Sequence, residues 1–336
     1  MKKQIANKER LVVYAVPYQE NSFFHSPWFQ RIVNDNFTIE NYVEGKAYSN
    51  DTVFVVGARQ YLEQDQREKF NDRRVIVDAT WESYTGKYKK LYGKLRNPNH
   101  LYFYGNYNTE PVEGTVFVPN FFWYNESLWW KMHQYDQYRP ERNYSKKFLM
   151  PIGHARGWRD EILTSLKPWL NSDALWSCIS HGVSLPVKEN KENITWHRYQ
   201  NFSWYDNTCF TIALESARSW NEAVIFLTEK IYKPIGMKHP FMVMGQAGIL
   251  KYLKSQGFVS YDNIFDESYD LTSDLGEKIS IIINNVSNYK KEPYDNETLN
   301  RIDHNFNLFY DKDRVISGLT TDLVNPMKEF INKNNN

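Results

Sequence analysis

Short apolar runs alternate along this chain with longer polar segments of helical character, and this alternation constrains the fold more than any other feature. The first part contains runs with the length and apolarity of buried strands, at residues 11–16, 52–57, 74–78, 101–104 and 115–118. A helix is expected among them near residues 58–70. Strands that alternate with helices form parallel sheets. The pattern therefore predicts an α/β fold.

The same pattern starts again after a polar stretch at residues 134–147, which is the best candidate for a linker. Further strands are expected at 148–152, 174–179, 209–214 and 241–244. Further helices are expected near 159–169, after Thr228, and near 246–255, 274–288 and 311–331. We therefore predict two Rossmann-like domains, 1–145 and 146–336, that face a cleft. Ligands of such sheets bind at the carboxyl ends of the strands.

Composition excludes several classes of protein. The chain has 336 residues, of which 41% are hydrophobic and 24% charged, so it is globular and long enough for two domains. The net charge of +1 gives no overall basic field for nucleic acid, although it leaves a local basic groove open. Cys178 and Cys209 lie in predicted strands and are expected to be core residues. No N-terminal segment resembles a signal peptide or membrane anchor, so we expect a cytoplasmic protein without stable membrane insertion.

Common catalytic and cofactor motifs are absent from the sequence. It has no P-loop, no Gly-x-Gly-x-x-Gly after the first strand, no Gly-x-Ser-x-Gly elbow and no Cys/His spacing typical of zinc sites. Asp311-Lys-Asp313 could hold a divalent cation through a sugar diphosphate. In a charged helical segment, however, such a pair arises by chance far more often than as a metal site. The sequence therefore predicts neither a metal nor a cofactor.

Charged residues gather instead at the predicted strand ends of the second half. Thr228 is expected to cap a helix whose first turn carries Glu229 and Lys230, and Arg159 opens another helix. A helix N-terminus offers free N–H groups to an anion, whereas a cation there opposes the helix dipole unless an anion compensates. Glu215 ends a predicted strand. Together these residues could neutralise a pyrophosphate and accept hydrogen bonds from sugar hydroxyls, although a solvated charged face is the plain alternative.

The segment from Phe226 to Lys230 resembles the donor-binding motif Tyr/Phe-x-Thr-Glu-Lys of the bacterial α1,3-fucosyltransferases. As in that family, a strand ending in Glu215 precedes it and an apolar strand ending in Gly245 follows. Those enzymes are inverting and metal-independent, have the two-domain glycosyltransferase-B fold, and use GDP-fucose. The family's motif Tyr is Phe226 here, so one hydroxyl contact with the donor is missing.

The resemblance implies roles for particular residues. Glu229 and Lys230 would contact the nucleotide and phosphates of the donor, together with the rest of the motif, Phe226 and Thr228. The resemblance further implies that Arg159 is the phosphate-binding arginine and that Glu215 is the strand-terminal glutamate of the donor site.

The segment 73–83 looks like the strand and loop that carry the family's catalytic glutamate. Glu82 is therefore the candidate base, with Asp78 second. A second resemblance is to a branch of phage and bacterial glycosyltransferase-like proteins that share Thr-Glu-Lys, Lys-Pro, His-Pro-Phe and Asp-Glu-Ser-Tyr-Asp. The last of these motifs stands here at residues 266–270.

These resemblances imply a nucleotide-sugar-dependent glycosyltransferase, with residues 1–145 binding the acceptor and 146–336 the donor. We expect a saccharide acceptor. One alternative is a phage enzyme that glycosylates hydroxymethylated bases of DNA, in which case it would act in the host cytoplasm. Its phosphate contacts would come from a basic run that also reads as a solvated helix face: Lys87, Lys89, Lys90, Lys94 and Arg96. A second alternative is a non-catalytic protein that binds a sugar or nucleotide.

Overall fold

The computed structural model describes residues 9–14, 32, 35–50, 52–61, 64–80, 97–105, 107–108, 112–155, 157–185, 198–216 and 224–333. The chain divides into two compact units. The first comprises Met1–Trp129 and Lys312–Asn336, and the second comprises Trp130–Asp311. The sequence predicted two segments, 1–145 and 146–336. In the structure, residues 130–145 belong to the second unit, and residues 312–336 at the C-terminus belong to the first.

The first unit contains a six-stranded sheet of order β2-β1-β3-β4-β5-β7, in which every neighbouring pair is parallel. Its strands are β1 Glu9–Tyr14, β2 Phe37–Asn41, β3 Val53–Gly57, β4 Arg74–Ala79, β5 His100–Tyr104 and β7 Thr115–Phe117. Every residue of β3 is buried, as expected for a parallel strand covered on both faces. The sequence pattern missed β2 because this edge strand is half exposed and carries Thr38, Glu40 and Asn41.

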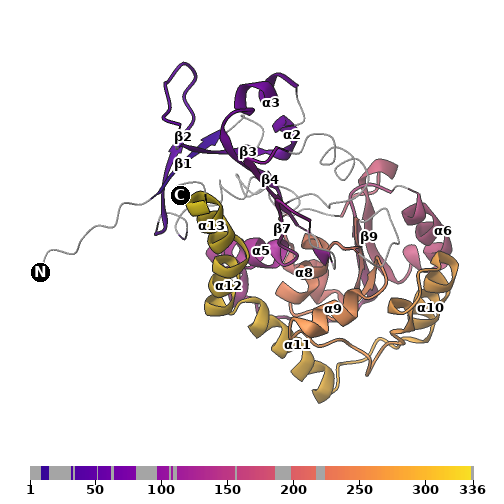
Figure 1. Ribbon diagram of the computed structural model, residues 1–336. Coiled ribbons are helices and arrows are strands. Elements are labelled where there is room, and N and C mark those ends of the chain that lie inside the picture. Colours follow the sequence, from indigo (N-terminus) through magenta and orange to yellow (C-terminus); the bar gives the residue numbers. More distant parts are fainter. Residues whose placement is uncertain are drawn as a thin grey trace, which may run out of the picture. The chain divides into compact units, whose positions relative to one another are not determined.

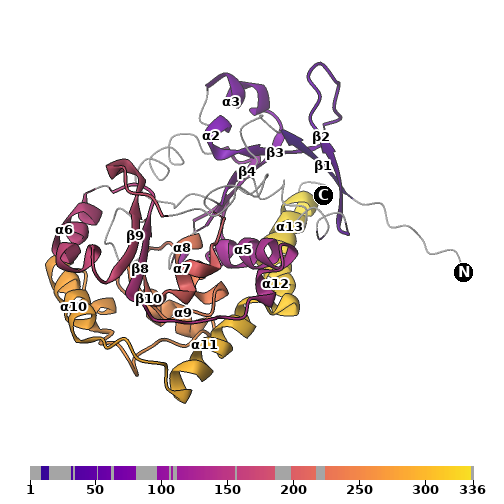
Figure 2. The ribbon, with the colours of Figure 1, turned by 180° about the vertical axis from the view of Figure 1, so that it is seen from behind.

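Helices of the first unit come from both ends of the chain. They are α2 Ala58–Tyr61, α3 Gln64–Phe70, α5 Phe121–Met132, whose last residues belong to the second unit, α12 Lys312–Leu319 and α13 Asn325–Lys333; β6 is a short strand, Tyr107–Asn108. The helix predicted over 311–331 is α12 and α13 joined by a π-helical turn at Thr320–Val324. There Asp322 Oδ2 accepts a hydrogen bond of 2.9 Å from Tyr124 Oη of α5. This contact fastens the C-terminal helices, which run beside α5 in Figures 1 and 2, to the first unit.

The second unit contains a four-stranded parallel sheet of order β12-β10-β8-β9. Its strands are β8 Lys146–Ile152, β9 Ala174–Cys178, β10 Thr208–Leu214 and β12 Phe241–Met244, and β11 is a short strand, Val224–Ile225. All residues of β10 and β12 are buried. Two parallel sheets with interleaved helices confirm the predicted α/β class.

Helices cover both faces of this sheet. They are α6 Trp158–Leu170, α7 Phe202–Asp206, α8 Glu229–Gly236, α9 Ile249–Ser255, α10 Leu275–Asn288 and α11 Asn296–Phe309, with single 3₁₀ turns η2 Tyr135–Gln137, η3 Ile179–His181 and η4 Ser268–Asp270. Figures 1 and 2 show α6 and α10 on one face and α8 and α9 on the other. Helix α8 buries Ile231, Tyr232 and Ile235, and the Tyr232 ring stacks against Phe309 of α11.

A buried histidine fixes the segment between α8 and β12. His239 is fully buried; its Nδ1 lies 2.9 Å from Thr211 Oγ1 and its Nε2 lies 2.9 Å from Thr208 O. Burial lowers the pKa of His239 to about 3, so the ring is neutral and both nitrogens bond to β10. Cys178 and Cys209 are buried and free, which confirms them as core residues. Among the described residues, no helix is both long and apolar enough to span a membrane.

Candidate functional site

The carboxyl ends of β8, β10 and β12 meet at one edge of the four-stranded sheet, because these strands are parallel neighbours. The segment after β8 leads to Arg159 in α6, and the residue after β10 is Glu215. Thr228, which precedes α8, bonds to Glu215 at this edge. The structure therefore brings together the second-half residues that the sequence singled out.

Glu215 lies at the centre of this group and is fully buried. Its Oε2 accepts hydrogen bonds from Thr228 Oγ1 at 2.6 Å and from Ser216 N at 3.3 Å, and its Oε1 accepts one from Thr228 N at 3.2 Å. Burial raises the pKa of Glu215, while the charge of Lys230 and the bonds from Thr228 oppose this shift. The carboxylate that was predicted to contact a donor is thus directed into the protein, toward Thr228.

Thr228 caps α8, as the sequence predicted. Its backbone is extended, and its Oγ1 accepts the N–H of Lys230 at 3.5 Å. Lys230 Nζ lies 3.2 Å from Thr228 Oγ1 and 2.7 Å from Glu229 Oε1. The side chains of Lys230 and Glu229 are 22% and 14% exposed. Glu229 therefore offsets the unfavourable interaction of Lys230 with the helix dipole, and both side chains are partly exposed.

Arg159 lies in the first turn of α6, and its guanidinium reaches the end of β10. Nη2 donates to the carbonyl oxygens of Leu214 at 3.1 Å and Glu215 at 2.6 Å, and Nη1 donates to His154 O at 3.0 Å. The guanidinium also stacks over the Trp158 ring, 5.4 Å from its centroid. These contacts hold a positive charge at the same strand edge as the start of α8.

Phe226 is buried, and its N–H donates to Gln246 Oε1 at 3.1 Å. Gln246 is itself buried and stands two residues after the end of β12. Sequence reasoning missed Gln246. The only signal for it was its position just beyond a predicted strand and Gly245, where a parallel sheet places ligand-binding and supporting side chains.

The candidate bases of the first half lie apart in the sequence from these residues. Asp78 lies near the carboxyl end of β4 and is buried; its Oδ1 accepts bonds from Thr80 N at 3.1 Å and Thr80 Oγ1 at 2.7 Å, a turn-forming arrangement. Glu82 lies outside the described residues, as do the basic residues Lys87, Lys89, Lys90, Lys94 and Arg96. The assignment of the base remains a prediction.

No cluster of three or more His, Cys, Asp or Glu side chains in the described part of the chain has the geometry to hold a metal ion. Asp311 and Asp313, the acidic pair considered from the sequence, are exposed at the start of α12.

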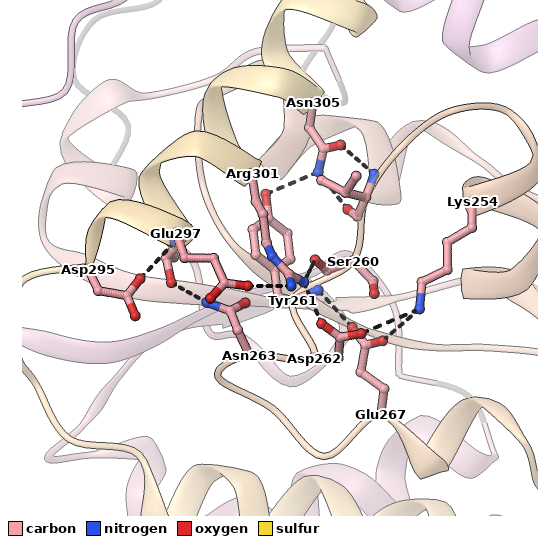
Figure 3. Close-up of polar contacts among 12 residues, drawn as sticks. Lys254, Ser260, Tyr261, Asp262, Asn263, Glu267, Asp295, Glu297, Arg301 and Asn305 are labelled. Atoms are coloured by element: carbon pink, nitrogen blue, oxygen red, sulfur yellow. Dashed lines mark hydrogen bonds and ion pairs between the residues drawn. The ribbon is translucent and has the colours of Figure 1, made fainter.

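The Asp-Glu-Ser-Tyr-Asp motif at residues 266–270 belongs to a loop between α9 and α10 that its neighbours hold tightly (Figure 3). Asn305 accepts a hydrogen bond from the Val259 N–H and donates one to the Val259 carbonyl oxygen, each at 2.8 Å. Arg301 Nη1 donates to Ser260 O at 2.8 Å, and Glu267 Oε1 accepts from Tyr261 N at 2.8 Å. In Figure 3, Asn305, Arg301 and Glu267 surround Tyr261. These contacts give the loop, and Glu267 of the motif, a structural role.

No protein-family model matches the chain, and no curated protein matches it. Similar solved structures exist. An α1,3-fucosyltransferase structure aligns with 96% of this chain and 91% of its own, at a TM-score of 0.49 and 10% identity. One with GDP aligns with 94% of each chain at a TM-score of 0.46 and 10% identity, and one with GDP-fucose with 93% of each at 0.41 and 12%. Because these TM-scores and sequence identities are low, we assign the fold from the sheet topology and not from the similarity.

Proposed function

We propose that the chain is a glycosyltransferase that moves a sugar from a nucleoside diphosphate donor to a hydroxyl acceptor. One observation carries this proposal: the guanidinium of Arg159 and the first turn of α8, with Glu229 and Lys230, lie at the same edge of a parallel sheet. The motif around Thr228 resembles the donor-binding motif of the α1,3-fucosyltransferases, which supports the same function.

The electrostatics of this edge suit a diphosphate. Arg159 and Lys230 supply two positive charges, and the starts of α6 and α8 supply main-chain N–H groups. Lys230 Nζ bonds to Glu229 Oε1, and a phosphate oxygen would replace this partner. Glu229 would then accept hydrogen bonds from hydroxyl groups of the donor.

The proposed reaction is a single displacement without a metal. The acceptor oxygen attacks the anomeric carbon while the bond from that carbon to the β-phosphate oxygen breaks, and the acceptor proton passes to a carboxylate, for which we propose Glu82. The pair of electrons leaves with the diphosphate, whose charge Arg159 and Lys230 would stabilise. Attack opposite the leaving group inverts the anomeric configuration.

The arrangement that fits this reaction is that of a glycosyltransferase-B enzyme. In this proposal the unit with the six-stranded sheet binds the acceptor and the unit with the four-stranded sheet binds the donor. The first of these includes the C-terminal helices α12 and α13. We propose a saccharide as acceptor.

A transfer assay tests this function. The protein is incubated in EDTA with GDP-, UDP- and CMP-linked labelled sugars, each with an oligosaccharide or with DNA that contains hydroxymethylcytosine. Transfer to the oligosaccharide is expected. Transfer to the DNA alone would replace the proposed acceptor, and absence of both transfer and donor hydrolysis with every sugar nucleotide would overturn the function.

A further inference from the structure

Two buried side chains hold the segment that leads into α8. The N–H of Phe226 donates to Gln246 Oε1 at 3.1 Å, and the N–H of Thr228 donates to Glu215 Oε1 at 3.2 Å. Glu215 and Gln246 follow neighbouring parallel strands, β10 and β12. Leu227, between the two tethered residues, is buried. The start of α8 is therefore attached to the edge of the sheet at two points.

The position of Gln246 is itself fixed. Asp270 O accepts the N–H of Gly248 at 2.8 Å, and Asp270 Oδ2 accepts the N–H of Leu250 at 3.0 Å and that of Lys251 at 3.3 Å. Asp270 is buried and is the last residue of the 3₁₀ turn η4. Gly248 has a φ of 83°, a conformation that favours glycine. The turn that carries Gln246 thus has little freedom.

The end of β12, just before Gln246, packs closely against Glu215. A Cβ placed on Gly245 would lie 3.2 Å from Glu215 Cβ and 2.5 Å from Ile249 Cδ1. A side chain at position 245 would therefore require Ile249 to move and Glu215 to shift by a few tenths of an ångström. Glu215 consequently packs against Gly245 through its Cβ and Cγ and bonds to Thr228 through its carboxylate.

We infer that Glu215 and Gln246 are positioning residues, which set where the first turn of α8 presents Glu229 and Lys230 to the donor. The inference rests on the proposed function for the identity of that ligand. The carboxylate acts through Thr228, whose hydroxyl donates to Glu215 and in turn accepts from both the main-chain and side-chain nitrogens of Lys230. Neither positioning residue needs to touch the donor.

Glu215→Gln is the most informative variant. The amide keeps the shape but offers one acceptor in place of two, so an N–H group faces the Thr228 hydroxyl and the Ser216 N–H. The Thr228 hydroxyl must then rotate so that Oγ1 accepts a hydrogen bond from the Gln amide. This bond competes with the hydrogen bonds that Oγ1 accepts from Lys230. Gln246→Ala removes the other tether. Gln256→Ala, at the far end of α9, is the matched control because its amide donates to the neighbouring Ser255 Oγ at 3.3 Å.

The test combines amide hydrogen exchange with calorimetric titration of GDP, UDP and CDP into the full-length protein. We expect faster exchange at Ser216 and Lys230 in Glu215→Gln and at Phe226 in Gln246→Ala, with the exchange of β10 unchanged. For the diphosphate that the wild type binds, Kd should rise about tenfold in each variant, which corresponds to one weakened charge-assisted contact. Gln256→Ala should match the wild type in both measurements.

The outcomes separate this inference from the proposed function. If the wild type binds a diphosphate and both variants bind it equally well, the positioning role is wrong while the function stands. If exchange quickens throughout the second unit, the two residues serve general stability and the inference is overturned. If the wild type binds no nucleoside diphosphate, the proposed function fails, and the inferred effect on donor binding fails with it even where the exchange results agree.

Discussion

Arg159 contacts Glu215 at its main-chain carbonyl oxygen, 2.6 Å from Nη2, while the carboxylate of the same residue receives the hydroxyl of Thr228. The Glu215 carboxylate therefore serves the cap of α8, and the Arg159 guanidinium donates to main-chain carbonyl oxygens. Both contacts lie at the strand edge to which we assign the proposed donor.

Lys230→Ala should lower the rate of sugar transfer about ten- to a hundredfold, because a charged hydrogen bond to the diphosphate is worth roughly 1.5–3 kcal/mol. Lys254→Ala is the control: that lysine lies on α9 in the same unit, is exposed, and pairs with Glu267. Steady-state transfer kinetics make the comparison. Equal rates in Lys230→Ala and the wild type would remove Lys230 from the site.

Arg159→Ala should reduce transfer by a similar factor and should also lower the melting temperature, since three carbonyl oxygens lose their donor. Arg159→Lys keeps the charge but cannot form the same fork of bonds, so transfer should recover only in part. Lys167→Ala, in the last turn of α6, serves as control. A melting temperature unchanged in Arg159→Ala would contradict the contacts described for this residue.

His239 should make the second unit sensitive to acid. Its folded pKa of about 3 lies below the ordinary value of 6.5, so the unfolded chain binds a proton that the folded chain excludes. The stability from this residue is complete above pH 6.5 and is lost as the pH falls toward 3, by up to about 1.4 kcal/mol per pH unit.

Urea unfolding of wild type and His239→Gln between pH 4 and pH 7 measures this term. His100, with a lowered pKa, and Asp270 and Glu215, with raised pKa values, also titrate, but they are present in both proteins. Their contributions cancel in the comparison. The variant should show the weaker loss of stability on acidification; identical pH dependence would show that His239 does not titrate as described.

Asn305→Ala should lower the free energy of unfolding by about 1–3 kcal/mol, because both main-chain polar groups of Val259 lose their partner. Asn307→Ala, on an exposed position of the same helix α11, should change it by no more than about 0.5 kcal/mol. Chemical denaturation of the pair tests the structural role of the loop in Figure 3. Equal effects of the two substitutions would contradict that role.

Glu82→Gln should bind the donor normally and transfer poorly, since the change keeps the shape of the side chain and removes the proton acceptor. Asp78→Asn should mainly affect stability, because Asp78 already accepts two bonds from Thr80. Separate measurement of donor affinity and turnover distinguishes them. An inactive Asp78→Asn beside an active Glu82→Gln would reverse the assignment of the base.

Most of the longer strands and several helices could be predicted because buried parallel strands read as continuous apolar runs, as in β10 and β12. The cap at Thr228 and the charged residues Glu229, Lys230 and Arg159 could also be predicted, because a local sequence pattern marks the start of each helix. Helix α11 gave no such signal, since its polar, Asn-rich sequence becomes a helix through the cap at Asp295 and the burial of Ile302 and Phe306.

The direction of the Glu215 carboxylate and the role of Gln246 could not be predicted. Both depend on contacts between residues 13 and 20 positions apart, which form only once β10, β12 and α8 have packed together. A strand-terminal glutamate has the same sequence signature whether it faces a ligand or a neighbouring helix cap.

Binding of nucleoside diphosphates in EDTA is the most direct test of the proposed donor site. Calorimetric titration of GDP, UDP and CDP into the wild type, Lys230→Ala and Arg159→Ala should show that at least one diphosphate binds the wild type without a metal. The same diphosphate should bind each variant about tenfold or more weakly. Binding that requires a divalent cation, equal binding by all three proteins, or no binding by the wild type would contradict a metal-independent diphosphate site at this sheet edge.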